Sequence, residues 1–388
     1  MVTRSGPLTG IRIVDLTAVV MGPYCTQIMA DMGADVIKVE PPAGDVTRYI
    51  SDGPEHGMSG VFANANRGKR SIVLDLAVEA DRAVLRGLIE TADVFIHSMR
   101  ARAIARLGFD YAAVARINPQ IVYTNCYGYG RRGPDAGRPA YDDTIQAECG
   151  LASVQEMLTG TPGFVGSIVA DKVTGLTALY ATMMALFHRE RSGEGQEVEV
   201  GMFETMASFM LVEHANGALF DPPTGPAFYR RPVARDRRPY RTRDGYIAAL
   251  IYNDKHWNAF VGAVRPAWAA DRCFATVGER ARVIERVYAG VAETMLERTT
   301  VEWLELFHRL EIPAAAIQTP AQLFDSPHLD AVGFFETVAT QHGPVRFPGV
   351  PVSLSVTPGR ILSGAPMLGE HNDTIRAELA TRRTAVGE

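Results

Sequence analysis

One acidic residue stands where a carboxylate could act as a nucleophile. Asp171 lies at the start of an apolar segment, 171–191, that has the pattern of a long helix. The N-terminus of a helix keeps a carboxylate ionised and aimed, which covalent catalysis by a carboxylate requires. Acidic residues are also common at helix starts because they complement the helix dipole, and on spacing alone this structural interpretation is favoured.

Two further segments could bind anionic groups. Residues 128–133 fit the pattern G-x-G-x-x-G after an expected strand, as in a dinucleotide-binding turn. That turn must open a helix, and the prolines and glycines at 134–139 prevent one, so the pattern favours a glycine-rich loop. The run 229–243 holds seven arginines and one acid, and it could either bind carboxylates and phosphates or be a solvated linker.

Other catalytic patterns are missing from the sequence. The nine histidines include no pair spaced by four residues and no cluster with zinc-ligand spacing, so no metal site is expected. The nucleophile elbow G-x-S-x-G is also missing, which leaves ordinary esterase chemistry without support. The four cysteines are widely spaced and are expected to be reduced thiols.

The first half of the chain alternates β-branched runs with helical patterns. Such alternation predicts βαβ units and an α/β fold with an open, mostly parallel, Rossmann-like sheet. A helix is expected over 25–33 and another over 79–90. The expected strands lie at 11–16, 35–40, 71–76, 93–98 and 121–127.

The second half predicts a domain boundary. After the helix 171–191, a strand at 196–200 and a helix at 202–219, the Pro/Gly-rich stretch 220–245 interrupts all periodicity. We expect a large α/β domain over 1–200, a linker helix at 201–224, a small α+β domain at 225–315 and a return to the large domain at 316–388. The other expected elements are a strand from Tyr246 and helices at 253–264, 278–297, 300–310 and 372–381.

The composition favours a small-molecule function. The chain has 388 residues, of which 47% are hydrophobic and 21% charged, and its net charge of −5 supplies no field for nucleic acid. The longest apolar stretch, 176–187, is shorter than the about 20 residues that cross a bilayer, and the N-terminus has no apolar leader. We therefore expect a cytoplasmic protein with neither nucleic-acid nor membrane partners.

Several segments in order resemble the class III CoA-transferase family, also called CaiB/BaiF, which includes carnitine CoA-transferase and formyl-CoA transferase. The resemblance covers nearly the whole chain. Its segments are DLTAVVMGPYCTQIMADMGADVIKVEPPAGD, NRGKRSIVLDL, AYDDTIQAECG, ADKVTGLTALYATMMALFHRERSGEGQEVEVGM, DGYIAAL and GEHNDTI.

The resemblance implies a function and an assembly. In that family the motif that begins the long helix, here 170–175, carries a nucleophilic aspartate, which places Asp171 in this role. The implied activity is transfer of CoA from an acyl-CoA to a free carboxylic acid through an aspartyl anhydride and an aspartyl-CoA thioester. CoA and acyl-CoA would be substrates, with no tightly bound cofactor and no metal. The implied assembly is a homodimer of interlocked, ring-like chains.

The resemblance also implies CoA-binding positions. Lys69, Arg70 and Arg106 have the chemistry of phosphate partners for the nucleotide end of CoA, although each could be a surface charge. The full set is Val20, Asn66, Lys69, Arg70, Ser98, Met99, Arg106, Ala140, Tyr141, Asp142 and Met202.

Three departures from the family affect these expectations. Formyl-CoA transferase has a glutamine near the thioester where this chain has Val20, so an amide donor is missing. Its glycine-rich gating loop corresponds here to the arginine-rich run 229–243. The related α-methylacyl-CoA racemases pair the aspartate with a histidine, which aligns with Tyr141, and a tyrosine is a poor base at neutral pH.

Alternatives to CoA transfer stay open at this point. In a racemase or isomerase of the same family, Asp171 would only shuttle a proton. A nicotinamide-dependent dehydrogenase would need the glycines at 128–133 to bind NAD, and a CoA-binding regulator would need no catalysis. The arginine run suggests that the acid substrate carries a second carboxylate. Whether Glu148, Tyr141 or Asp142 assists Asp171 is not decided by the sequence.

Overall fold

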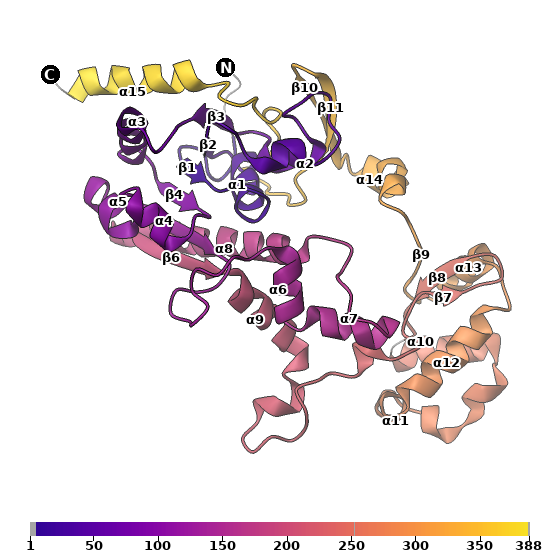
Figure 1. Ribbon diagram of the computed structural model, residues 1–388. Coiled ribbons are helices and arrows are strands. Elements are labelled where there is room, and N and C mark those ends of the chain that lie inside the picture. Colours follow the sequence, from indigo (N-terminus) through magenta and orange to yellow (C-terminus); the bar gives the residue numbers. More distant parts are fainter. Residues whose placement is uncertain (1–4, 252, 387–388) are drawn as a thin grey trace. The chain divides into compact units, whose positions relative to one another are not determined.

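The computed structural model describes residues 5–251 and 253–386, which divide into two compact units (Figure 1). Unit 1 contains the residues up to Ala152, Phe164–Met210 and the segment from Asp330. Unit 2 contains Ser153–Gly163 and Leu211–Leu329. Each unit has a hydrophobic core of its own. The chain thus leaves unit 1 and returns to it.

Unit 1 is built on a six-stranded sheet with the strand order β3-β2-β1-β4-β5-β6. Every pairing in it is parallel, as the alternation of strands and helices predicts. The order reverses between β1 and β4, which makes this the switch point of a doubly wound sheet. The strands are β1 (Arg12–Leu16), β2 (Asp35–Glu40), β3 (Arg70–Val73), β4 (Val94–His97), β5 (Val122–Tyr127) and β6 (Gln196–Gly201).

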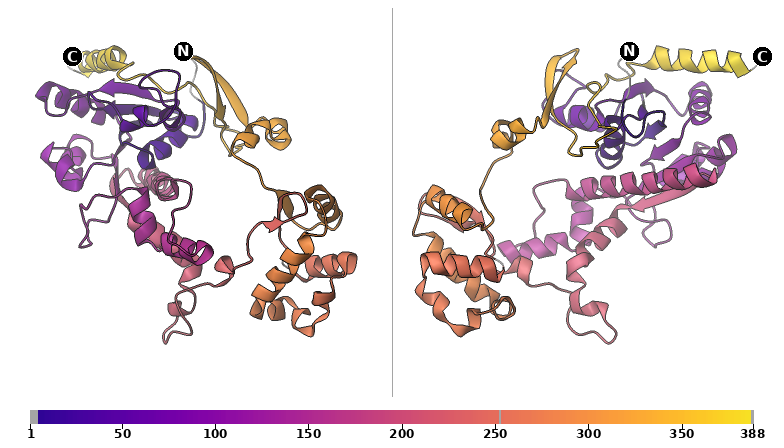
Figure 2. Two further views of the ribbon diagram at one scale, coloured as in Figure 1. Left: turned by 45° about the vertical axis from the view of Figure 1, so that its right-hand side comes forward. Right: turned by 180° about the vertical axis from the view of Figure 1, so that it is seen from behind.

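Helices cover both faces of this sheet because successive side chains of each strand point to opposite faces. In β1, Ile13 packs in one core and its neighbour Val14 packs in the other. Figures 1 and 2 show α8 as one long helix alongside β6. The first core includes residues of α1 (Met21–Asp31), α6 (Asp142–Glu148), α8 (Val169–Ser192) and α9 (Met202–His214). The second includes residues of α3 (Glu79–Ile89), α4 (Ala101–Arg106), α5 (Tyr111–Ile117) and α15 (Asn372–Val386).

The returning segment is tied to unit 1 by hydrogen bonds to the edge of the sheet and to the residues that follow α2 (Gly60–Asn66). The backbone N–H of Gly68 donates to Ser363 O at 3.0 Å, and that of His371 donates to Ser71 O at 3.0 Å. The segment also forms the antiparallel hairpin of β10 (Phe335–Thr340) and β11 (Gly343–Pro348). Unit 1 therefore resumes at Asp330, whereas the sequence placed the return at 316.

Unit 2 combines a small antiparallel sheet with helices around an aromatic core. Trp303 and Phe307 stack at 5.3 Å between ring centroids, and Phe260 packs against both. The strands are β7 (Tyr240–Arg241), β8 (Tyr246–Ala249) and β9 (Ala314–Ala316). The helices are α7 (Leu151–Thr159), whose first two residues belong to unit 1, α10 (Asp254–Val264), α11 (Val277–Arg282), α12 (Ile284–Met295), α13 (Thr300–Arg309) and α14 (Pro327–Ala331), whose last two residues belong to unit 1.

Two expected helices end earlier or divide. The helix expected at 278–297 is broken at Val283, whose backbone leaves the helical region, into α11 and α12. The helix expected at 202–219 ends at His214, because Asn216 has a left-handed φ of 40°, and continues only as a short 3₁₀ turn. Within the described part of the chain, no helix is long and apolar enough to cross a membrane.

Candidate active site

A pocket of about 980 Å³ opens at the carboxyl edge of the sheet in unit 1. Val19 enters it from the loop after β1, Ser98 from the loop after β4, and Gly128 from the loop after β5. The switch point lies between β1 and β4, and β5 is the next strand of the sheet. Ligands of open parallel sheets bind at the switch point. The topology therefore places a binding site here independently of the residue types that line it.

Asp171 lies inside this pocket, at the N-termini of two helices. It occupies the first turn of α8, lines the pocket and is 7% exposed. Its carboxylate accepts a hydrogen bond from the backbone N–H of Met21, the first residue of α1. The N–H of Met21 and the positive ends of two helix dipoles thus face one carboxylate, which is a geometry that stabilises negative charge.

A second acid, Asp142, fixes the start of α8. Its Oδ1 accepts hydrogen bonds from the backbone N–H groups of Ala170 at 2.7 Å and Asp171 at 3.1 Å. The side-chain amide of Gln146 donates to the other oxygen of Asp142, and the Oε1 of Gln146 accepts a hydrogen bond from Val165 N at 2.9 Å. Asp142 is therefore an N-cap supplied by α6 rather than by α8 itself.

Burial raises the pKa of Asp171 to about 6, and the negative charge of Asp142 adds to the increase, while the Met21 N–H opposes it. Desolvation therefore outweighs the helix ends, which the sequence interpretation expects to keep the carboxylate ionised. At pH 7 about nine-tenths of the carboxyl groups are still ionised, since the pKa is about one unit below that pH. The residue is thus an ionised but poorly solvated carboxylate.

The loop between β1 and α1, which presents Met21 to Asp171, holds a strained backbone. Val19 has a left-handed φ of 68°, a conformation that is rare for β-branched residues and costs about 1–3 kcal/mol. Its N–H donates to Asp45 Oδ1 at 3.3 Å, and the N–H of the preceding Ala18 donates to Ser98 Oγ at 3.1 Å. These contacts join the loops on the two sides of the switch point.

Wholly buried ion pairs support this loop from beneath. Lys38 Nζ donates to Thr17 O and to Asp45 Oδ2, both at 2.9 Å, and Lys69 Nζ donates to Asp15 Oδ2 at 3.1 Å. Burial alone would raise the pKa of Asp45, but the adjacent Lys38 holds it below its ordinary value. Buried, hydrogen-bonded pairs of this kind define a single arrangement of the groups that they contact.

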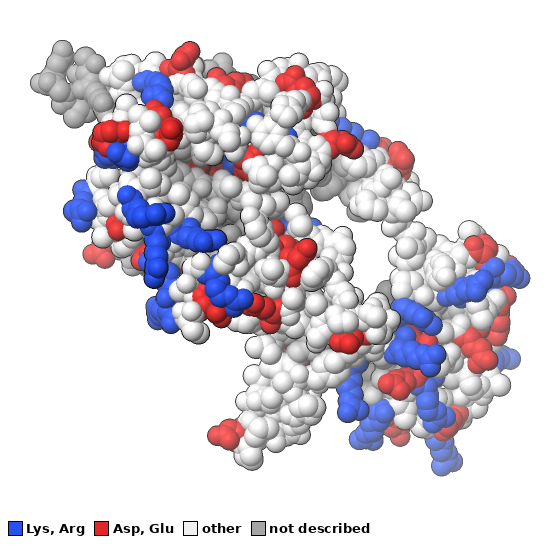
Figure 3. Space-filling view, viewed as in Figure 1, with Lys and Arg blue, Asp and Glu red and all other residues white. Residues whose placement is uncertain are grey.

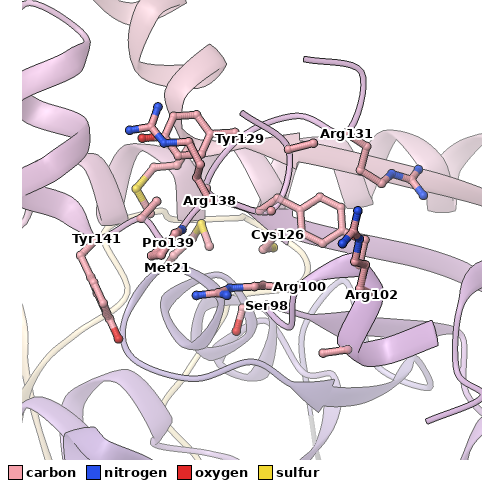
Figure 4. Close-up of a pocket in the computed structure, with 18 of the residues that line it drawn as sticks. Met21, Ser98, Arg100, Arg102, Cys126, Tyr129, Arg131, Arg138, Pro139 and Tyr141 are labelled. Carbon is pink, nitrogen blue, oxygen red and sulfur yellow. The ribbon is translucent and has the colours of Figure 1, made fainter. Parts of the chain in front are cut away.

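Arginines give the pocket a positive field. Arg100 and Arg102 come from the start of α4, and Arg131 and Arg138 come from the loop after β5 (Figure 4). Arg106, the last residue of α4, also lines the pocket. Among the described lining residues Asp171 is the only acid. Figure 3 shows basic side chains gathered on this unit beside its hollow. Such a pocket attracts anions, and guanidinium groups match phosphates and carboxylates.

The loop after β5 is held by carboxylates and does not open a helix, which confirms the expected glycine-rich loop. Arg131 pairs with Glu197 at 2.8 Å, and Arg138 pairs with Glu148 at 2.7 Å. Glu148 also accepts a hydrogen bond from Tyr129 Oη at 2.8 Å. Glu148 therefore anchors Arg138 and the loop and does not reach Asp171, although the sequence left that role open.

About half of the residues that the resemblance implies come together at this pocket. They approach it from the loops after β4 and β5, from α4 and from the starts of α8 and α9. Those that line it are Ser98, Arg106, Ala140, Tyr141, Asp171 and Met202.

The remaining residues of that set do not line the pocket. Lys69 is buried, and besides Asp15 its Nζ contacts Asn66 Oδ1 at 2.8 Å and Pro23 O at 3.0 Å. Arg70 pairs with Asp35 and Glu378, both at 2.7 Å. The positions outside the lining are Val20, Asn66, Lys69, Arg70, Met99 and Asp142.

Sequence reasoning missed Arg100 and Arg102, although both line the pocket. A signal was available, because both follow the strand at 93–98, and residues just after parallel strands gather at one edge of the sheet. The strand order that places this edge at the switch point was not available from the sequence. Cys126 and Tyr129 also line the pocket and were not singled out.

Comparisons with known proteins agree over almost the full length of the chain. A model of CoA-transferase family III matches residues 8–372. A succinate–glutarate CoA-transferase from Agrobacterium fabrum is 33% identical over 405 residues, covering 99% of this chain and 99% of that protein. A succinyl-CoA:mesaconate CoA-transferase from Haloarcula hispanica is 33% identical, covering 96% of each chain. The crystal structure of a CaiB/BaiF family protein from Brucella suis has a TM-score of 0.80 at 31% identity, covering 97% of this chain and 100% of that one. The chain therefore belongs to CoA-transferase family III.

Proposed function

We propose that this protein moves CoA from an acyl-CoA to a free dicarboxylic acid, with Asp171 as the covalent nucleophile. The observation that carries the proposal is a buried carboxylate with a pKa of about 6 in an arginine-lined pocket at the switch point. A desolvated carboxylate is more nucleophilic than a hydrated one, and the arginines attract a substrate whose nucleotide end carries phosphates. The names of the relatives support the class of reaction.

The first half of the reaction loads CoA onto the protein. A carboxylate oxygen of Asp171 attacks the thioester carbonyl, and the C–S bond breaks. CoA leaves as a thiolate, and a mixed anhydride between Asp171 and the acyl group remains. The thiolate then attacks the Asp171 carbonyl of that anhydride and releases the donor acid as its carboxylate. The product is an aspartyl-CoA thioester, which conserves the free energy of the original thioester.

The second half repeats these steps in reverse with a new acid. The incoming carboxylate attacks the carbonyl of the aspartyl thioester, which gives a second mixed anhydride and CoA thiolate. The thiolate attacks the acyl carbonyl, so that the new acyl-CoA forms and Asp171 returns as a carboxylate. No proton is gained or lost over the cycle. Oxyanions that form during these steps would lie near the N–H groups at the start of α1.

Binding roles follow from the pocket lining. We propose that Arg100, Arg102 and Arg106 contact the phosphates of CoA. The other lining residues of the implied set would contact the rest of the CoA molecule; they are Ser98, Ala140, Tyr141 and Met202. Lys69 and Arg70 would instead support the protein through their ion pairs. Asp142 would position Asp171 as its helix cap.

The alternatives have less support at this site. A racemase needs a second acid–base group, and the aligned Tyr141 is 67% exposed. An NAD site needs its glycine turn after β1, whereas the glycines at 128–133 follow β5 and open no helix. Hydrogen exchange at the α-carbon of an acyl-CoA, without exchange of CoA between acids, would support the racemase.

A panel of acids tests the proposed substrate class. With succinyl-CoA as donor, we expect kcat/KM for dicarboxylic acids such as glutarate or mesaconate to exceed that for monocarboxylic acids of equal length by at least about 10-fold. A single hydrogen bond between charged groups in a buried site contributes a factor of about this size. Formation of the new thioester, followed by chromatography, is the measurement. A preference for long-chain monocarboxylic acids would reject the dicarboxylate class and leave CoA transfer itself intact.

The pH dependence of the rate should follow Asp171. The nucleophile must be ionised, and its pKa in the free protein is raised to about 6, so kcat/KM for acyl-CoA is expected to rise with pH, reach half its maximum near pH 6 and level off above pH 7. An unperturbed aspartate would give half-maximal rate near its ordinary pKa of about 4. Steady-state rates between pH 4 and 8, with folding checked at each pH, measure this. A flat profile from pH 5 to 8 would contradict the assignment.

We also propose that two copies associate through the outer face of α8. Leu176, Tyr180, Met184 and Phe187 recur at helical spacing on this face and are 44%, 53%, 66% and 64% exposed. A stripe of large apolar side chains on a monomer is typical of a protein interface. Sedimentation should give twice the chain mass of 42.2 kDa, and the pair Met184→Glu with Phe187→Glu should give the monomer, whereas Arg116→Glu, at an exposed position of α5, should not. A monomeric parent protein at micromolar concentration would reject this interface. The interlocking of two chains stays a prediction.

A further inference from the structure

Unit 2 holds a pocket that has no role in the scheme above. Its volume is about 580 Å³, within the range of small-molecule sites. Three segments that are distant in the sequence form it: the 3₁₀ turn at Arg231–Val233, the end of β8, and the junction between α11 and α12. All of its lining residues belong to unit 2.

Five arginines converge on this pocket from two of those segments. Arg230 and Arg231 come from the arginine-rich run, and Arg280, Arg282 and Arg286 come from the α11–α12 junction. Among the described lining residues the only acid is Glu285. Figure 3 shows basic and acidic side chains mixed over the surface of this unit, so the excess of arginine is a property of the pocket lining. The break at Val283 matters here, because it ends α11 within the pocket and starts α12 there.

Three of these arginines already form ion pairs or hydrogen bonds within unit 2. Arg280 is buried and pairs with Asp254, and Arg286 pairs with Asp271 at 3.0 Å. Arg231 Nε donates to Tyr288 Oη at 3.2 Å, which orients its guanidinium group. Arg230 and Arg282 are exposed, and in the described part of the chain neither has a carboxylate within ion-pair distance. The pocket therefore keeps two cations that can pair with an added anion.

The floor of the pocket favours an organic anion over an inorganic one. Val287 and Val291 of α12 are buried, and Ala249 and Ile251 close the side next to β8. An apolar floor below a cationic rim matches a molecule with a carbon backbone and more than one carboxylate. Arg230 and Arg282, which have no carboxylate partner in the described part of the chain, gain one when such an anion binds.

We propose that this pocket binds a small di- or tricarboxylate, and that Arg230 and Arg282 supply the direct contacts. The site is separate from Asp171 chemistry and does not depend on the proposed function. Of the seven arginines in the run 229–243, only Arg230 and Arg231 belong to it. Arg243 instead pairs with Glu302, and Arg238 with Asp236.

Arginine-specific labelling tests this directly. The Asp171→Ala protein is treated with phenylglyoxal, and the adducts are located by peptide mass spectrometry, with and without citrate or succinate. We expect either anion to slow labelling of Arg230 and Arg282 by at least about 5-fold, with saturation. Arg235, which is exposed on the same run outside the pocket, is the matched control and should label at an unchanged rate.

Further arms separate binding from simple screening of charge. Sodium chloride at equal ionic strength, acetate and inorganic phosphate should each protect much less than citrate. Arg230→Ala should abolish the saturable protection of Arg282, whereas Arg235→Ala should preserve it. Equal protection by sodium chloride, equal protection by phosphate, or no protection of either arginine would each overturn the proposal. None of these results depends on CoA transfer, because the labelled protein lacks Asp171.

Discussion

Replacement of Asp171 by Ala is expected to lower kcat for CoA exchange by at least about 10⁴-fold. Removal of a covalent nucleophile from a site whose binding groups remain has effects of about this size or larger. KM for acyl-CoA should change little, because the arginines that line the pocket, which we propose to bind the phosphates, are untouched. Steady-state kinetics with one acyl-CoA and one acid measure both constants. A residual rate within about 10-fold of the parent would remove Asp171 from the mechanism.

The same site predicts a gain in stability when the charge is removed. The pKa of Asp171 rises from 3.8 to about 6 on folding, so the buried carboxylate destabilises the fold above its unfolded pKa, by up to about 3 kcal/mol. Asp171→Asn should therefore be inactive but more stable at pH 8, and the gain should vanish as the pH falls toward 4. Asp143→Asn, an exposed acid on α6, should change neither rate nor stability. A destabilised Asp171→Asn protein would contradict this account of the pKa. Thermal unfolding at both pH values is the measurement, after a check that the asparagine has not deamidated.

Gly175→Ala is expected to lower both activity and stability, although alanine is the better helix former. A Cβ at Gly175 would lie 2.5 Å from Met21 O and 3.3 Å from a ring carbon of Tyr24. The nearer atom belongs to the backbone of α1, so α1 must move away from α8. The same residue, Met21, donates the hydrogen bond to Asp171, and a displacement of about 1 Å in a catalytic group costs about 100-fold in rate.

The sign of the stability change decides between two effects. Helix propensity alone would stabilise Gly175→Ala by about 1 kcal/mol, whereas overpacking costs about 1–3 kcal/mol. We expect the second to dominate, with a lower midpoint in denaturant and a kcat reduced by about 10- to 100-fold. Glu190→Ala, on an exposed position of the same helix, should keep the parent rate. If Gly175→Ala were as active as the parent and more stable, the close approach of α1 and α8 would not matter to the site.

The parts of the fold that local patterns specify could be predicted from the sequence. Strand alternation located the strands of the parallel sheet, and the apolar run 171–191 located α8 to within two residues at its start. Asp171 was identifiable because it combines a helix start with a family motif. The motif glycine, Gly175, had no explanation until the backbone of α1 was found beside it.

The rest depends on contacts between distant segments. The order of strands in the sheet is set by tertiary packing, so the switch point and the place of Arg100 in the pocket lining could not be read from local patterns. Lys69 and Arg70 have the residue types of phosphate ligands, but the acids that pair with them, Asp15 and Asp35, lie far away in the sequence. The raised pKa of Asp171 reflects burial and Asp142, neither of which a helix pattern reveals.

The most direct test of the account is the detection of CoA or an acyl group on Asp171 itself. The protein is mixed with acyl-CoA alone, quenched rapidly, treated with hydroxylamine and mapped by peptide mass spectrometry. The account predicts a hydroxamate at Asp171, none at the neighbouring Asp142, and a rate of formation at least equal to kcat. Full CoA exchange with an unmodified Asp171 at every quench time would contradict it.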